Sequence, residues 1–345
     1  MRFGVVAIGR NEGERLRRCL ESVCGCGMPV VYVDSGSSDG SVDVALSLGA
    51  ELVELDLSTP FTAARARNAG RERLRELDPT LEAAQFIDGD CELDPAWLDT
   101  AAKALGERTD LAVAWGRRRE RAPESSIYNR LCDLEWDTPV GDSTWFGGDA
   151  LIRLDAFDAV GGYDPAVIAG EEPDLAWRLR SAGWHIERLD AEMTLHDAAI
   201  TRFAQWWRRA ERAGHAHIDM AARHGFGVEP YAPKGVVKTL VWSIILPLVV
   251  SVAAVVWSPW TLLALGLYDL LFLKITIGAH RSGRSWSNAI TLGIFTVLAK
   301  WPETLGYLRW AARRISGRRA TIIEYKRPSP TPGRGPSAPT PSDAT

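Results

Sequence analysis

Residues 83–90 read Ala-Ala-Gln-Phe-Ile-Asp-Gly-Asp, an apolar run followed at once by two carboxylates one residue apart. The apolar part predicts a buried strand, whose end brings Asp88 and Asp90 to one point. Paired carboxylates in such a place can hold a divalent cation, and that cation can neutralise the phosphates of a nucleotide-linked substrate. Because an Asp-x-Asp pattern also arises by chance, its meaning depends on the neighbouring sequence.

Short apolar runs alternate with amphipathic stretches on the N-terminal side of this segment. Strands are expected at 5–8, 30–33 and 52–55, and helices at 14–23 and 42–48. This alternation is typical of βαβ units around a mostly parallel sheet, so we expect an α/β fold. Ligands of such sheets bind beyond the carboxyl ends of the strands, where one crevice could collect several polar motifs. These motifs are Gly9-Arg10-Asn11-Glu12, Asp34-Ser35-Gly36-Ser37-Ser38-Asp39-Gly40 and Asp88-Gly89-Asp90.

The chain of 345 residues divides by charge into an acidic part and a basic part. Residues 1–233 carry 26 Lys and Arg against 40 Asp and Glu, whereas residues 234–345 carry 14 against 4. A basic segment that is also strongly apolar favours a membrane surface over nucleic acid, and the acidic part disfavours nucleic acid too. Five cysteines, an odd number, fit reduced thiols better than a disulfide framework.

The apolar residues of the basic part predict membrane helices. Residues 239–257 contain no charge over 19 positions, about the length that crosses a bilayer core. A second stretch, 261–279, carries two charges and is a candidate second span. A third, 289–310, is interrupted by charges and a proline, so it either spans or lies in the interface.

Loop charges and composition then divide and orient the chain. Basic residues before the first span and after the second place both flanks in the cytoplasm by the positive-inside rule. The N-terminus has no signal-peptide pattern, so the first domain is expected to stay in the cytoplasm. We expect a catalytic domain at 1–233, membrane-associated helices at 234–320 and a disordered tail at 321–345 that is rich in Pro, Ser and Thr.

The order of the polar clusters is more specific than any one of them. Arg10-Asn11-Glu12 is followed by the Asp34 turn, by Arg67-Asn68 and then by Asp88-Gly89-Asp90. In this order the chain resembles the family 2 nucleotide-sugar glycosyltransferases, over roughly residues 3–215. The resemblance implies a GT-A fold, a Rossmann-like α/β sandwich.

The resemblance also implies roles for individual residues. Asp34 matches the carboxylate that contacts the nucleobase, and Asp90 matches the direct ligand of Mn²⁺ or Mg²⁺, with Asp88 nearer the ribose and as a further ligand. His196 resembles a histidine that completes the metal coordination or contacts the diphosphate. The implied nucleotide-sugar site comprises Ala7, Arg10, Asn11, Glu12, Asp34, Ser35, Arg67, Asn68, Asp88, Gly89, Gly147 and Gly148.

The catalytic base is expected in Gly170-Glu171-Glu172-Pro173-Asp174-Leu175, which resembles the family pattern Gly-Glu-Asp-x-(Asp/Glu)-Leu. The third position is the base, here Glu172, which would take the proton of the attacking hydroxyl. Since the family most often has Asp there, the base stays open between Glu172 and Glu171, with Asp174 third. An acidic first turn that favours the helix dipole would explain the same residues.

Two further segments are assigned to the acceptor or the diphosphate. Trp145 lies in a segment that resembles the wall of the donor-sugar and acceptor pocket. Gln205-Trp206-Trp207-Arg208-Arg209 partly resembles the Gln-x-x-Arg-Trp box of processive polysaccharide synthases, with Arg209 in place of the last Trp. Arg208 and Arg209, with Arg202 and Arg212, form a cationic stripe at helical spacing that could bind diphosphate or a lipid phosphate at the membrane surface.

The expected function is that of an inverting, metal-dependent glycosyltransferase anchored in the inner (cytoplasmic) membrane, with its catalytic domain in the cytoplasm. It would move one sugar from a nucleoside diphosphate sugar to a lipid-linked or cell-envelope glycan acceptor. A processive synthase is the first alternative, although two or three apolar segments are few for a translocation channel. A catalytically silent sugar-nucleotide binding protein is the second, although the acidic residues of the site argue against it.

Overall fold

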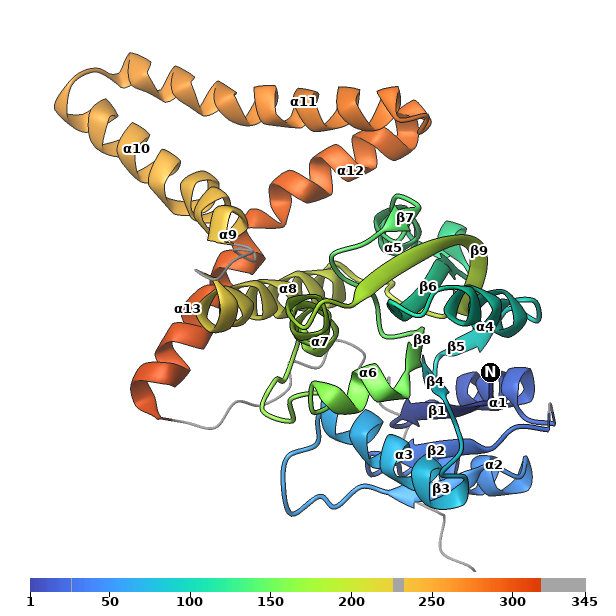
Figure 1. Cartoon of the computed structure of the whole chain (residues 1–345). Helices are drawn as coiled ribbons and strands as arrows, with labels where there is room; N and C mark the ends of the chain where they lie inside the picture. The colour runs from blue at the N-terminus through green and yellow to red at the C-terminus, as the bar shows by residue number, and fades with distance from the viewer. Residues whose placement is uncertain (26, 226–232, 318–345) are drawn as a thin grey trace, which may run out of the picture.

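The computed structural model describes residues 1–25, 27–225 and 233–317, and shows an α/β domain with a long helical arm (Figure 1). The strands are β1 (Phe3–Gly9), β2 (Val30–Asp34), β3 (Glu51–Glu54), β4 (Ala83–Asp88), β5 (Cys91–Leu93), β6 (Leu111–Glu120), β7 (Gly141–Asp142), β8 (Ala150–Arg153) and β9 (His185–His196). The helices of this domain are α1 (Glu14–Val23), α2 (Ser41–Ser47), α3 (Ala63–Leu77), α4 (Trp97–Glu107), the short 3₁₀ helix η1 (Pro123–Ser125), α5 (Ile127–Glu135), α6 (Leu154–Ala159), α7 (Glu171–Ser181) and α8 (Phe203–His224).

The strands form one mixed sheet in the order β3-β2-β1-β4-β8-β6-β9-β5, with β7 paired to β9. The first four of these positions are parallel. Strand β8 is antiparallel to both β4 and β6, and β9 is parallel to β6 but antiparallel to β5 and β7. The α/β class is confirmed and the sheet is mixed: strands β1 to β4 are parallel to one another, and beyond β4 parallel pairing continues only between β6 and β9. Beyond β4 the strands run in both directions.

The expected elements of the first hundred residues form where the apolar pattern put them. Strands β1, β2 and β4 are buried over almost their whole length because helices cover both faces of the sheet. In register, Ile8 of β1 lies beside Asp88 of β4, and Gly9 lies beside Asp34 of β2. The carboxyl ends of three strands therefore meet at one edge of the sheet.

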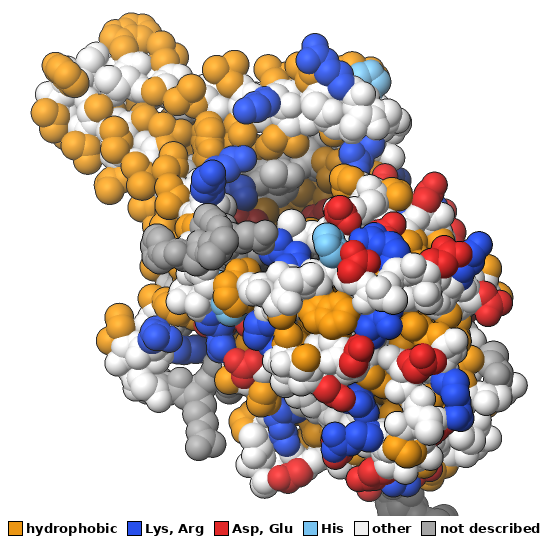
Figure 2. All heavy atoms as spheres, in the orientation of Figure 1, with side chains coloured by type: hydrophobic (Ala, Val, Ile, Leu, Met, Phe, Trp, Pro, Cys, Tyr) orange, Lys and Arg blue, Asp and Glu red, His pale blue; other side chains and the backbone are white. Residues whose placement is uncertain are grey.

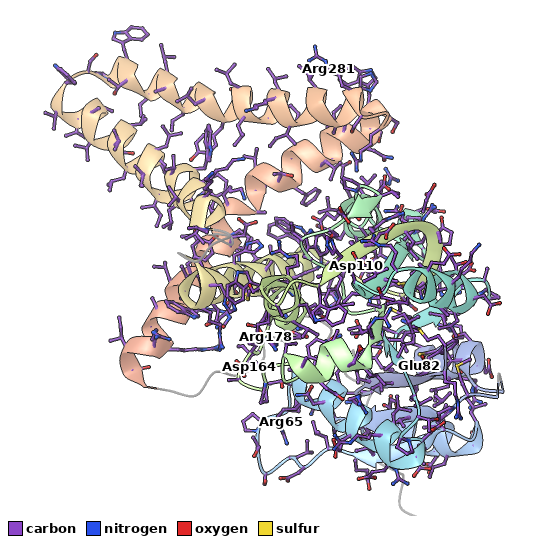
Figure 3. The ribbon with its side chains drawn as sticks, viewed as in Figure 1. Arg65, Glu82, Asp110, Asp164, Arg178 and Arg281 are labelled. Carbon is purple, nitrogen blue, oxygen red and sulfur yellow. The ribbon has the colours of Figure 1, made fainter. Side chains whose placement is uncertain are left out.

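The arm consists of helices that carry apolar residues on most of their surface. It comprises α9 (Pro233–Leu240), the π-helical turn η2 (Val241–Ile245), α10 (Leu246–Val256), the 3₁₀ segment η3 (Pro259–Gly266), α11 (Leu267–Arg281), α12 (Trp286–Leu298) and α13 (Lys300–Ser316). Two continuous helical segments, Pro233–Val256 and Pro259–Arg281, are long and apolar enough to cross a membrane. Only 17% and 11% of their most apolar windows are buried, so these are not core helices. Figure 2 shows the corresponding apolar surface, and Figure 3 shows Arg281 at the end of α11.

These two segments coincide with the spans expected at 239–257 and 261–279. The third apolar stretch, 289–310, is divided at Ala299 into α12 and α13 and is not among the span candidates of the described chain. Helix α13 lies against α8 of the α/β domain, and a Cβ on Gly214 would collide with the backbone of Glu303. The expected domain division at residue 233 stays a prediction, and the tail at 321–345 lies outside the described residues.

Candidate active site

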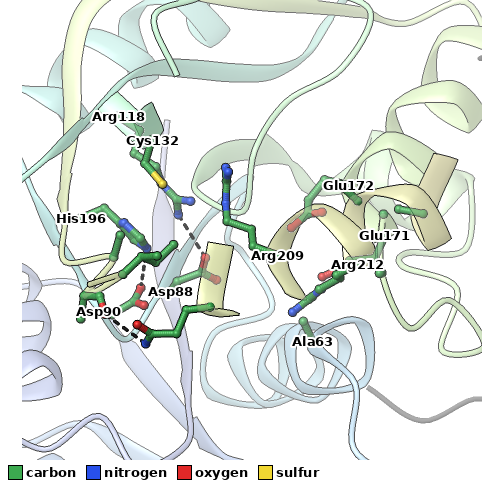
Figure 4. Close-up of a pocket in the computed structure, with 18 of the residues that line it drawn as sticks. Ala63, Asp88, Asp90, Arg118, Cys132, Glu171, Glu172, His196, Arg209 and Arg212 are labelled. Carbon is green, nitrogen blue, oxygen red and sulfur yellow. Dashed lines mark hydrogen bonds and ion pairs between the residues drawn. The ribbon is translucent and has the colours of Figure 1, made fainter. Parts of the chain in front are cut away.

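A pocket of about 850 Å³ lies at the carboxyl ends of β1 and β4 (Figure 4). One part of its wall is the loop after β1 and the turn at Asp88–Asp90. The other part is formed by α5, the start of α7, α8 and the junction of α12 with α13. The strand-end motifs and the acidic helix start, which are more than eighty residues apart in the chain, therefore face one cavity.

Arg67 joins the two acidic motifs. Its side chain is 2% exposed, and its Nη2 donates to Asp88 Oδ1 at 2.8 Å. Its Nη1 lies 3.0 Å from Glu171 Oε1 and 3.1 Å from Glu172 Oε1. Burial alone would lower the pKa of Arg67, but the carboxylates of Glu172, Asp88 and Glu171 hold it above its usual range. The guanidinium thus fixes the distance between β4 and the start of α7.

Asp88 faces cations rather than the second aspartate of its motif. Its Oδ2 accepts from Arg118 Nη2 at 3.0 Å, and its backbone N–H donates to Asp149 Oδ1 at 3.0 Å. Burial alone would raise the pKa of Asp88, but Arg67 and Arg118 hold it well below the usual range. Asp88 is therefore ionised at neutral pH, and its two oxygens are oriented by two arginines.

Asp90 faces His196 instead. The side chain of Asp90 is 7% exposed, and its Oδ1 lies 3.4 Å from His196 Nε2. On the other side of the ring, His196 Nδ1 lies 3.5 Å from Glu120 Oε2. Burial lowers the pKa of His196, which favours the neutral imidazole that binds metals, although Glu120 opposes this shift.

These donors fit Mn²⁺ or Mg²⁺. Asp90, Cys91 and His196 each offer a ligand atom within 4.8 Å of the others. Carboxylate oxygen and imidazole nitrogen suit Mn²⁺, whereas burial raises the pKa of the Cys91 thiol well above its usual value and keeps it protonated. Glu120 beside the histidine corresponds to the carboxylate that commonly orients a metal-binding imidazole.

Glu172 has the properties of a general base. Its side chain is 16% exposed and lines the pocket, whereas that of Glu171 is 4% exposed. Burial and the neighbouring Glu171 raise the pKa of Glu172 to about 7, against the opposing effect of Arg67. A carboxylate with a pKa near 7 can accept a proton at neutral pH, because the transfer is then close to energetically balanced.

The loops after β1 and β2 are tied to each other. Asn11, at φ 56° in the left-handed region, donates its backbone N–H to Ser37 Oγ at 2.9 Å. Its Oδ1 accepts from Ser38 N at 2.7 Å. Asp34 Oδ2 accepts from the backbone of Gly36 and Ser37 at 2.8 and 2.7 Å. These hydrogen bonds fix the floor of the pocket, which includes Ser35.

The structure does not bring every expected site residue to the pocket wall. Asp34 is buried against its own turn, and Ala7 lies inside β1. Asn68 exchanges two hydrogen bonds with the backbone of Tyr163, at 2.7 and 3.0 Å. Trp145 packs on Trp115 at a centroid distance of 5.1 Å.

On α8, Arg209 lines the pocket, whereas Arg208 is exposed outside it. Asp174, the third candidate base, pairs with Arg178 and His224, at 2.7 and 2.8 Å. Arg178, labelled in Figure 3, also donates to the carbonyls of Val160 and Gly162 and thereby holds α7 in place. Asp174 therefore stabilises the helix that carries Glu172 and lies outside the pocket lining.

The three glycines of the implied site differ in their surroundings. A Cβ on Gly148 would lie 2.7 Å from Asp88 Oδ2 and 2.8 Å from Arg67 Nη2, so the Asp88–Arg67 pair requires a residue without a side chain there. A Cβ on Gly147 would meet nothing within 4 Å. A Cβ on Gly89 would lie 3.0 Å from the carbonyl of Ile8.

Three residues of the site, Asp149, Arg118 and Glu120, were not expected from the sequence. Asp149 is fully buried and holds Arg118 through two hydrogen bonds, at 2.9 and 2.7 Å, and accepts from Thr194. Arg118 and Glu120 are two residues apart on β6 and both face the site, where they contact Asp88 and His196. Arg212, which the sequence places in a cationic stripe with Arg208 and Arg209, lines the pocket from α8. The charged run at the end of an apolar strand, Arg117-Arg118-Arg119-Glu120, was the one available signal.

The chain is similar to proteins of one family. Residues 5–143 match the family described as Glycosyl transferase family 2. The chain is 27% identical over 246 residues to the pre-mycofactocin glycosyltransferase of Mycobacterium tuberculosis, covering 67% of this chain and 50% of that protein. It is 25% identical over 195 residues to the succinoglycan biosynthesis protein ExoA of Rhizobium meliloti, covering 52% and 58%. The chain thus spans about half the length of the curated relatives it matches.

A solved structure shares the fold. The mannosyltransferase PcManGT of Pyrobaculum calidifontis, solved in complex with GDP-Man and Mn²⁺, aligns with a TM-score of 0.52 at 18% identity. The alignment covers 91% of this chain and 87% of that one. This likeness confirms the GT-A-like α/β architecture followed by helices.

Proposed function

Residues 5–143 belong to glycosyl transferase family 2, and from this premise we propose that the chain is an inverting, metal-dependent transferase. It moves one sugar from a nucleoside diphosphate sugar to a lipid-linked or cell-envelope glycan acceptor at the cytoplasmic leaflet. The observation that carries the proposal is the set of three ion pairs by which Arg67 joins Asp88 to Glu171 and Glu172 across one pocket. A donor site and a base are thereby held within reach of a single anomeric carbon.

The chain's own residues divide the chemistry among them. Asp90 and His196 would hold Mn²⁺ or Mg²⁺, which supplies positive charge to the departing diphosphate when bound. Glu172 takes the proton of the acceptor hydroxyl while the hydroxyl oxygen forms a bond to the anomeric carbon. The bond from that carbon to the phosphate oxygen breaks, and the diphosphate leaves with the electron pair. Attack opposite to the leaving group inverts the anomeric centre.

Arg67 and Arg118 orient the carboxylates of the site. Arg118 is held by the buried Asp149 and in turn holds Asp88. Because Asp88 and Glu172 both contact Arg67, the base and the donor side are positioned as one unit. Preorganisation of this kind lowers the barrier because little rearrangement is needed during the reaction.

The arm supports the proposed membrane attachment. Two segments of the described chain are long and apolar enough to span, and their charged flanks fit a cytoplasmic catalytic domain. The GDP-Man and Mn²⁺ of the mannosyltransferase support a nucleotide-linked donor with a divalent cation for this chain. Both points support the proposal at the level of enzyme class.

The test is a donor screen on the detergent-solubilised full chain. Release of nucleoside diphosphate from one donor of a UDP- and GDP-sugar panel is expected with Mn²⁺ or Mg²⁺ and is expected to stop with a chelator. Absence of release from every donor, with and without added membrane lipid extract, would favour the silent sugar-nucleotide binding protein. Product length separates the remaining alternative, because a ladder from one priming event would indicate a processive synthase.

A further inference from the structure

The half of the pocket away from the nucleotide motifs has a wall of its own. Its apolar lining includes Trp206 and Ala213 of α8, and its far end includes Ala299 and Glu303, where α12 meets α13. Helix α12 follows α11, the second candidate span, after a short turn. Because its lining includes residues at the α12–α13 junction, this half of the pocket lies beside the arm that we place in the membrane. Figure 1 shows α8 and α13 side by side.

The surroundings of Arg212 indicate that this half of the pocket binds an anion. Arg209 and Arg212 lie one turn apart on α8 and both line the pocket (Figure 4). Arg209 pairs with Glu135 at 2.6 Å, and Arg67 and Arg118 deeper in the pocket also hold carboxylates. Within the described chain, by contrast, Arg212 has neither an ion pair nor a hydrogen bond.

A partly buried guanidinium without a counterion is a ready binding group for phosphate. It has already lost part of its hydration, and its fork of N–H donors matches phosphate oxygens. The carboxylates Glu171 and Glu172 line the same pocket. A ligand that fills this half would thus present a neutral hydroxyl near Glu172 and its negative charge near Arg212.

From these observations we propose that the acceptor is an amphiphile that carries a phosphate or diphosphate. Arg212 binds that phosphate while the acceptor's apolar chain leaves the pocket past Ala299 toward the membrane. This inference rests on the proposed function, since it assigns the acceptor class of the same site. The attacking group remains a hydroxyl beside Glu172, and the phosphate is the part of the acceptor that Arg212 holds.

The test measures binding without turnover, using the full chain in nanodiscs. Dodecyl phosphate is the probe, and dodecyl glucoside, which has the same chain without charge, is its control. Arg212→Ala should weaken dodecyl phosphate binding by about tenfold or more and leave dodecyl glucoside binding unchanged. Arg212→Lys should retain most of the affinity because the charge remains.

Lys103→Ala is the matched control, because it removes one positive charge from an exposed position on α4. It should bind dodecyl phosphate like the unmodified chain, whereas an equal loss in both alanine variants would mean non-specific surface attraction and would overturn the proposal. Equal binding of dodecyl phosphate by Arg212→Ala and the unmodified chain would overturn it as well.

A second arm identifies the source of the phosphate. Binding of GDP and UDP with Mn²⁺ should be the same in Arg212→Ala and in the unmodified chain. If Arg212→Ala weakens nucleoside diphosphate binding but not dodecyl phosphate binding, the anion is the donor's diphosphate and the acceptor assignment is wrong. Because neither arm needs sugar transfer, a failed donor screen leaves this result interpretable on its own.

Discussion

The two halves of the pocket differ in how their side chains are held. On the nucleotide side, Asn11 hydrogen-bonds to the loop after β2, Asp34 accepts from the backbone of its own turn, and Asp88 is held by two arginines. On the proposed acceptor side, Arg212 comes from α8, which packs against α13 of the arm. Within the described chain its guanidinium has neither an ion pair nor a hydrogen bond. The side chains of the nucleotide side are therefore held in place before a ligand binds. On the proposed acceptor side, the positive charge of Arg212 is available to a ligand.

The largest effect is expected from Asp90→Ala. Removing this carboxylate from beside His196 should lower metal-dependent turnover by about a thousandfold or more, since several kcal/mol of charge stabilisation are lost. Steady-state nucleotide release against Mn²⁺ concentration measures it, with thermal unfolding as the check on folding. Cys91→Ala is the matched control: the protonated thiol is no ligand for a hard cation, so metal dependence should persist. Normal turnover of Asp90→Ala would remove the metal hypothesis.

Glu172→Gln should lower kcat by a factor of about 10² to 10⁴ while donor affinity changes little, because general-base catalysis contributes about that much. Isothermal titration with the nucleoside diphosphate separates the two quantities. The variant should remain folded, since the amide keeps the shape of the side chain. If Glu171→Gln abolished turnover while Glu172→Gln retained it, the base would be Glu171 instead.

Gly148→Ala should lower kcat/KM by roughly a hundredfold, because its Cβ would push on Asp88 and Arg67 and displace the donor side from the base. Gly147→Ala places its Cβ in open space, so its effect should be much smaller. Parallel kinetics of the two variants measure the difference. Equal activity of both would show that the Arg67 contacts do not position the reacting groups.

Glu120→Gln should weaken Mn²⁺ binding by about tenfold to a hundredfold, the range found when a group that orients a metal ligand is changed. The carboxylate lies 3.5 Å from His196 Nδ1 and also accepts from Asn129 and from the backbone of Ala198. Electron paramagnetic resonance of Mn²⁺ gives the affinity directly, without turnover. An unchanged affinity in a folded variant would assign Glu120 a structural role only.

The smallest effect is a shift in pH dependence. Because the pKa of Glu172 is raised to about 7, mainly by burial and next by Glu171, kcat should fall as the pH drops below about 7. Glu171→Gln removes the neighbouring negative charge, so the pKa of Glu172 should fall and the acid limb should move to lower pH. A pH–rate profile measures both. An acid limb that moved upward in this variant would contradict the assigned interaction.

The raised pKa of Glu172 also makes the free energy of unfolding decrease with rising pH. Since the pKa of Glu172 in the folded chain lies above its value of 4.5 in an unfolded chain, its contribution to the free energy of unfolding is lost as the pH rises through about 7. Glu172→Gln should therefore reduce the difference in stability between pH 5 and pH 8. Denaturant unfolding at both pH values measures this difference.

The sequence predicted what depends on local pattern. Helix α1 begins and ends at the expected residues because Leu16, Cys19, Leu20 and Val23 recur at helical spacing. The strand-end motifs converge as expected because parallel strands place their carboxyl ends at one edge. Which of these residues faces the ligand was less accessible: Asp34 serves its own turn and Asn68 serves Tyr163.

Contacts between distant segments account for what the sequence did not reveal. Arg118 and Asp149 are 31 residues apart and meet only because β6 pairs with β8, and Glu120 reaches His196 through the pairing of β6 with β9. The division of the third apolar segment into α12 and α13 also follows from tertiary packing, since α13 lies along α8. No local periodicity encodes these pairings.

The measurement that tests the account most directly is a structure of the chain with a nucleoside diphosphate and Mn²⁺, with the anomalous signal of the metal recorded. We predict that the anomalous peak places Mn²⁺ within bonding distance of Asp90 and His196. The diphosphate should lie beside the metal, and Glu172 should face the open side of the pocket. A nucleotide bound elsewhere, or a peak away from both residues, would contradict the assignment of this pocket as the active site.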